Sequence, residues 1–105
     1  MRTHQWIDER SRTLAAAVAE RVHRDPALMT DVRARLERRI AVGAPRGKAT
    51  AREWLRLLDS LPLRALLEFL VEESEDATRL RQSSPFLSIL SSAERDAIMQ
   101  QFERL

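Results

Sequence analysis

The chain contains no cysteine among its 105 residues. This absence excludes disulfides, thiolate nucleophiles and cysteine-based metal sites. Histidine is also scarce: His4 and His23 are the only imidazoles, and they lie far apart without an acidic residue at a metal-ligand spacing. A zinc site needs three or four converging ligands. We therefore expect no metal and no cofactor.

Glycine is limited to Gly43 and Gly47. The chain accordingly has no glycine-rich phosphate loop, and it also lacks a Gly-x-Ser-x-Gly nucleophile elbow. No apolar run approaches the ~20 residues that a membrane span requires, and "MRTHQWIDER" lacks the apolar core of a secretory signal. These absences predict a protein that is not an enzyme, does not enter a membrane and is cytoplasmic.

Ala, Leu, Arg and Glu dominate the composition, and all four are good helix formers. No segment shows the strict alternation of apolar and polar residues that is typical of a strand. With 44% hydrophobic residues, a chain of this length should fold without covalent staples. We predict an all-α fold, a compact single-domain bundle over residues 1–105 with five or six helices and short connections.

Two helices are predicted in the first part of the chain. Apolar residues at three- and four-residue spacing predict a helix over residues 5–24. Asp25 is suited to be an N-cap and Pro26 to be the first helical residue, so a second helix is predicted over residues 26–42. Gly43 follows at the position where a left-handed C-cap residue is expected.

The stretch "GAPRGKA", residues 43–49, combines two glycines, a proline and two basic residues, and it is predicted to be a flexible linker. A third helix is predicted over residues 50–59. Thr50 and Glu53 have the spacing of a capping box, in which each side chain binds a free amide of the first turn.

The second half of the chain predicts two or three further helices. Pro62 lies in the first turn of a fourth helix. That helix either continues as far as Arg81 or breaks, in which case Ser74 caps a short fifth helix; we favour the break or a kink. Ser91 and Glu94 form a second capping box, which begins the last helix.

Positive charge is concentrated in residues 25–49, which hold six basic and three acidic residues. A basic helix face can neutralise phosphates and produce salt-dependent binding. The alternative is a solvated polar face, because Glu37 lies inside the cluster and no aromatic residue accompanies it. The predicted linker is also too long for the turn of a helix-turn-helix motif. The candidate nucleic-acid contacts are Arg33, Arg35, Arg38, Arg39, Arg46 and Lys48.

The segment "PFLSIL", residues 85–90, is unusually apolar for a connection between helices. Either it covers the core as a lid, or it remains exposed and marks an interface. Aromatic residues and arginine commonly anchor such interfaces. The candidate partner-binding residues are Trp54, Phe69, Phe86, Leu87, Arg79 and Arg81. A homodimer would use such a surface equally well and stays open.

The stretches "LRQSSPFLSILSSAER", "DPALM" and "AREWLRLLD" give the chain the style of small helical proteins encoded in short operons of GC-rich bacteria. With these three stretches together, the chain resembles the antitoxin-like members of that group, which bind and neutralise a neighbouring toxin. The resemblance covers most of the chain. It implies that the working surface is an interface, and it transfers no catalytic residue.

These observations predict a protein-binding module, an antitoxin-like neutralising partner of a neighbouring bacterial protein such as a toxin from the same operon. The mechanism would be occlusion, with apolar anchors buried in a cleft and arginines paired with acidic groups at its rim. The alternative is a nucleic-acid-binding transcriptional regulator that uses the basic face of the second helix.

Overall fold

The computed structural model describes residues 4–103. This range is all-α, with six α-helices and no strand, which confirms the predicted fold class. None of the helices described is long and apolar enough to cross a membrane. The elements are α1 (His4–Arg24), α2 (Leu28–Val42), α3 (Pro45–Ser60), α4 (Leu63–Leu70), α5 (Glu75–Arg81), the 3₁₀ turn η1 (Leu87–Ile89) and α6 (Ser92–Glu103).

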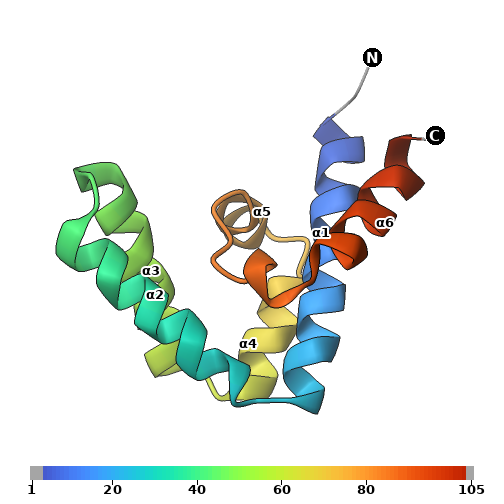
Figure 1. Cartoon of the computed structure of the whole chain (residues 1–105). Coiled ribbons are helices and arrows are strands. Elements are labelled where there is room, and N and C mark those ends of the chain that lie inside the picture. Colours follow the sequence, from blue (N-terminus) through green and yellow to red (C-terminus); the bar gives the residue numbers. More distant parts are fainter. Residues whose placement is uncertain (1–3, 104–105) are drawn as a thin grey trace.

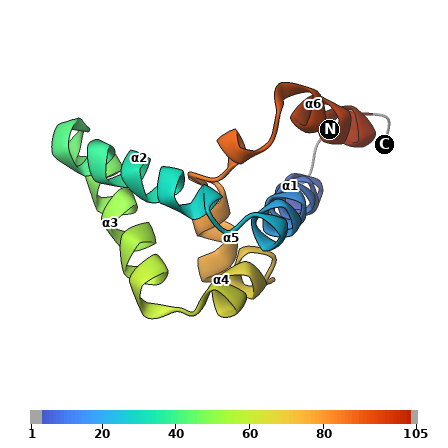
Figure 2. The same cartoon turned by 60° about the horizontal axis from the view of Figure 1, so that its bottom comes forward.

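The helices form two limbs joined by shorter elements (Figure 1). Helices α2 and α3 pack along each other as a hairpin, which projects to one side. The long helix α1 forms the other limb and contacts α4, α5, η1 and α6. Helix α6 lies along the outer side of α1, and a connector separates it from α5 (Figure 2).

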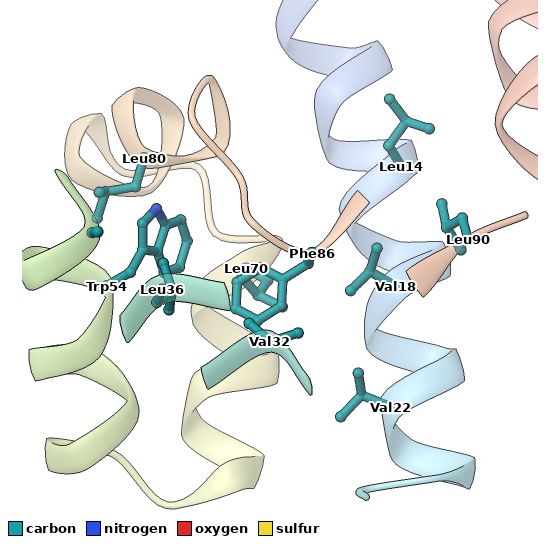
Figure 3. Packing of buried hydrophobic residues seen from close by; sticks show 11 residues of the cluster. Leu14, Val18, Val22, Val32, Leu36, Trp54, Leu70, Leu80, Phe86 and Leu90 are labelled. Atoms are coloured by element: carbon teal, nitrogen blue, oxygen red, sulfur yellow. The ribbon is translucent and has the colours of Figure 1, made fainter. Parts of the chain in front are cut away.

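The core lies where the hairpin meets α1, and Phe86 of the connector is at its centre (Figure 3). The Trp54 ring, from α3, contacts the Phe86 ring edge to face, with centroids 5.1 Å apart and planes at 82°. Leu36 and Val18 belong to the same buried cluster, from α2 and α1 respectively. The connector therefore supplies the side chain that joins the two limbs.

Helix α6 is attached to α1 at two places. Toward the start of α1, the Trp6 ring packs edge to face on Phe102, with centroids 6.0 Å apart, and the Trp6 indole N–H donates to the Phe102 carbonyl at 3.0 Å. Nearer the other end of α1, Arg21 pairs with Glu94. These two attachments show that α1 and α6 run antiparallel.

The connection between α2 and α3 corrects the prediction of a flexible linker over residues 43–49. Only Gly43 and Ala44 lie between the two helices, and α3 begins at Pro45. Proline suits the first helical position because its missing N–H has no helical partner there. Thr50 is consequently in the interior of α3, where its hydroxyl donates to the Arg46 carbonyl at 3.2 Å. The predicted capping box at Thr50 is therefore wrong.

Gly43 is not the left-handed residue that the sequence predicts, since its φ is −80° and its ψ is 168°. Its amide donates to the Arg39 carbonyl at 2.7 Å, and a Cβ atom at this position would collide with that same carbonyl. Glycine is needed here for close approach of the backbone. Helix α2 also begins later than predicted, at Leu28, after a turn in which the Leu28 amide donates to the Asp25 carbonyl at 3.1 Å.

Two predicted helix starts in the second half are confirmed. Ser74 caps a separate short helix, α5, by accepting from the Ala77 amide at 3.2 Å. At the start of α6, the Ser91 amide donates to the Glu94 carboxylate at 3.0 Å, and the Glu94 amide donates to the Ser91 hydroxyl at 3.1 Å. This reciprocal pair is a complete capping box.

Candidate functional site

The structure buries two of the aromatic residues that the sequence marks as candidate partner contacts. Trp54 and Phe86 are each only 1% exposed. Both are needed to fill the core, so neither is a surface anchor in this fold. For Phe86 and Leu90, which is also buried, the lid interpretation of "PFLSIL" describes the structure.

Arg81 is a structural residue rather than a surface cation, since it is 6% exposed. One guanidinium nitrogen donates to the carbonyls of Leu70 and Glu72, at 3.2 and 2.6 Å. The other donates to the Asp8 carboxylate at 2.9 Å. Arg81 therefore fastens α5 to the end of α4 and to α1, and its charge is committed to Asp8.

Arg79, also proposed from the sequence as a partner contact, is exposed but paired. Its guanidinium donates to both carboxylate oxygens of Glu53, at 3.0 and 2.6 Å. These bonds lower the pKa of Glu53 and raise the pKa of Arg79. The pair connects α5 to the hairpin, so a partner would have to displace an existing bidentate contact.

The remaining two candidates, Phe69 and Leu87, are half-buried. Phe69 packs against the core from α4. Leu87 also lines an open groove between α1 and α6, with a volume of about 410 Å³. The other apolar side chains of this groove are Ile7, Leu14 and Met99. Ile7 is 37% exposed, and it is one of two large apolar residues that are exposed among residues 4–103. We call this feature the α1–α6 groove.

The α1–α6 groove is bordered by positive charge. Its lining includes Arg10, Arg81 and Arg95 and contains no acidic residue among those described. The Arg10 guanidinium lies over the Trp6 ring, 4.8 Å from its centroid. Neither Arg10 nor Arg95 forms an ion pair within the described part of the chain, whereas Arg81 is bound to Asp8. The groove thus combines an apolar floor with two cations that are free to bind an anion.

Sequence reasoning did not find Arg10 and Arg95 because they are separated by most of the chain and meet only through the packing of α6 on α1. Each is, however, one helical turn from an apolar residue, Leu14 and Met99 respectively. Such four-residue spacing places both members of a pair on one helix face. This signal was available for each helix, but it could not show that the two faces lie together.

The basic residues of the hairpin divide into two groups. Arg33 forms an ion pair with Asp59 at 2.8 Å, and Arg35 bonds to Ser88. From Arg38 to Arg56, on both sides of the connection between α2 and α3, the chain has six basic side chains and only one acidic residue, the Glu53 already bound to Arg79. We call these six the basic tip: Arg38, Arg39, Arg46, Lys48, Arg52 and Arg56.

The basic tip includes four of the six residues predicted as nucleic-acid contacts. Gly47, which stands between Arg46 and Lys48 in α3, lies beside the Arg39 side chain of α2. Val42, at the end of α2, is 85% exposed. Because the connection between the helices has only two residues, the long linker that argued against a compact DNA-binding hairpin does not exist.

Within residues 4–103, no three side chains of His, Asp or Glu are grouped so that they could hold a metal ion. Comparison with known proteins adds no assignment: no family model, no curated protein and no solved structure matches the chain.

Proposed function

We propose that this protein is a protein-binding module and that its binding surface is the α1–α6 groove. The observation that carries the proposal is an apolar depression of about 410 Å³ that stays open at the surface of a small helical domain. Protein interfaces combine an apolar centre with a polar rim. Of the partner contacts predicted from the sequence, Leu87 and Arg81 line the groove, and Arg81 is bound to Asp8.

The more specific form of the proposal is an antitoxin-like protein in a bacterial cytoplasm, whose partner is a toxin encoded in the same operon. It is favoured by the resemblance of "LRQSSPFLSILSSAER" and the two shorter stretches, and by an interface without groups suited to catalysis. Inhibition would follow from occlusion, because a partner surface seated in the groove is removed from its own substrate.

Co-expression with the product of the adjacent gene tests this proposal. We expect the two proteins to copurify as a complex. Met99→Asp places a charge on the apolar floor and should weaken the complex by at least about tenfold, which is the size of a 1.4 kcal/mol loss. Val42→Asp introduces the same charge at an exposed apolar residue of the hairpin and should have no effect. Failure of the neighbouring protein to bind, or equal effects of both variants, would contradict the proposal.

A second candidate function, nucleic-acid binding by the basic tip, is favoured by one observation. Six basic side chains lie within residues 38–56, on both sides of the connection between α2 and α3, and the single acidic residue in this range is paired with Arg79. Binding of this kind depends strongly on salt, with a slope of about −0.9 per phosphate neutralised on duplex DNA. The triple variant Arg39→Ala, Arg46→Ala, Lys48→Ala should reduce that slope by roughly 3. If the salt dependence of duplex binding is the same in the triple variant, the basic tip is not the DNA-binding surface.

A further inference from the structure

We infer that the α1–α6 groove accepts one amphipathic helix of a partner protein, with acidic residues flanking its apolar stripe. The inference rests on the proposed protein-binding function and specifies the chemistry of the partner. A helix laid in a groove is a common recognition mode, in which apolar side chains at three- and four-residue spacing serve as anchors. The shape, the apolar lining and the positive charge of the groove all favour this kind of ligand.

The shape of the groove suits an elongated occupant. Two helices form its walls, with Leu14 on α1 and Met99 on α6, and Leu87 of the connector closes its floor. It is partly open to solvent, whereas small-molecule sites enclose most of their ligand. A smaller apolar cavity of about 40 Å³ shares Leu14 and Leu87 with the groove and lies between it and Phe86. An anchor side chain therefore meets a floor that is not tightly packed.

The positive charge of the groove favours a partner helix that carries negative charge. Arg10 and Arg95 have no carboxylate partner among the residues described, and no acidic side chain lines the groove with them. Stacking on Trp6 orients Arg10 in advance, which reduces the side-chain entropy that binding must remove. A cationic or purely apolar helix would leave both guanidinium groups without an anion.

The antiparallel packing of α1 and α6 separates the two cations. Trp6 contacts Phe102 at one end of the helix pair, and Arg21 contacts Glu94 nearer the other. Arg10 lies close to the first attachment and Arg95 directly follows Glu94 at the second. Ile7, one turn before Arg10, also lines the groove, so the two arginines border the apolar floor without closing its two ends. A matching helix carries carboxylates that flank its apolar stripe.

A displayed library of 20-residue helices provides the test. Leucine is fixed at the anchor positions, and the flanking positions vary among Glu, Gln and Lys. We expect selection on the wild-type chain to enrich Glu at the flanks. Selection on the double variant Arg10→Glu, Arg95→Glu should enrich Lys instead, and helices selected on the wild type should bind this variant about tenfold more weakly. The double variant Arg38→Glu, Arg39→Glu changes net charge equally at the basic tip and should keep the enrichment of Glu.

Several results would overturn the inference. The first is that Met99→Asp abolishes the binding of none of the selected helices. The second is that selection on the wild-type chain enriches Gln or Lys at the flanks. The third is that both charge-reversal variants change the selection equally. A fourth result would also overturn it: decanoate occupies the groove while no helix is enriched. The ligand would then be a small anionic amphiphile. If the neighbouring protein binds in the groove but the helix library gives one of these overturning results, the proposed function stands and only the acidic-helix chemistry is wrong.

Discussion

The hairpin α2–α3 and the α1–α6 limb use their arginines differently. In the basic tip, the cations are spread over the end of α2 and much of α3, and none of them forms an ion pair within the described residues. Along α1, most arginines are engaged: Arg12 pairs with Glu73 at 3.0 Å, Arg21 pairs with Glu94, and only Arg10 is left to the groove. Dense charge alone favours long-range attraction. A few free cations around an apolar floor favour a partner held in one orientation.

The two regions also depend on each other, because Trp54 of the hairpin and Phe86 of the connector are joined in one core. Substitutions at this junction should have the largest effect on stability, followed by those at Arg81 of α5, in the hairpin and at the cap of α6.

The largest effect is expected at the junction. Trp54→Ala removes a fully buried aromatic side chain and should lower the free energy of unfolding by about 3–5 kcal/mol. The indole N–H of Trp54 is buried and has no acceptor among the described residues, and such a donor costs about 1–3 kcal/mol. Trp54→Phe removes that donor along with some volume, so its loss should be less than half as large. Urea unfolding measures both; a loss for Trp54→Phe as large as that for Trp54→Ala would contradict this prediction.

The next largest effect is expected at the α5 anchor. Arg81→Met leaves the carbonyls of Leu70 and Glu72 without this donor and should cost about 3 kcal/mol, since each buried unpaired group costs about 1–3 kcal/mol. Arg79→Met is the matched control, because it removes an exposed ion pair, and such pairs contribute little to stability. Thermal unfolding of the two variants should rank them in this order. The reverse order would contradict the assignment of Arg81 as the structural arginine.

The two glycines should respond oppositely to alanine. Gly47 lies inside α3, where an added Cβ meets only the Arg39 side chain at 3.9 Å. Gly47→Ala should therefore stabilise the hairpin by about 0.5–1 kcal/mol, the usual difference between Gly and Ala in a helix. Gly43→Ala should destabilise it, because the new Cβ collides with the Arg39 carbonyl. Denaturant midpoints measure both changes. A stabilising Gly43→Ala would show that the close approach at the helix turn is absent.

The smallest effect is a pH dependence at the start of α6. The Ser91 amide and Arg21 hold the pKa of Glu94 below its ordinary 4.5. A lowered pKa contributes stability that is present above the ordinary value and is lost as the pH falls through the folded-state value. Glu94→Gln should therefore reduce the decline of the thermal midpoint between neutral and acidic pH. An unchanged decline in this variant would show that Glu94 does not titrate with folding.

Local chemistry explains which parts of the fold were predictable. Ser74, Ser91 and Glu94 act on amides within three residues, so their roles follow from spacing alone. Thr50 and Glu53 have the same spacing, yet Pro45 begins α3 earlier and Glu53 is bound by Arg79 from a distant helix. A local pattern decides a helix start only when no stronger start lies just upstream.

The functional surface was less predictable than the helices. The sequence offers Trp54 and Phe86 as partner contacts because they are large and aromatic, with a lid over the core as the other interpretation of Phe86. The structure buries both side chains. Sequence reasoning assigned Arg79 and Arg81 to a partner, although carboxylates and carbonyls from other helices bind both. Only tertiary packing decides which arginines remain free.

Methyl NMR of the complex with the adjacent gene's product tests the central claim most directly. The proposed groove predicts that the methyl signals of Ile7, Leu87 and Met99 shift or broaden on binding, while those of Val42 in the hairpin stay unchanged. Perturbation confined to Val42 and the basic tip, with the groove methyls unaffected, would contradict the account.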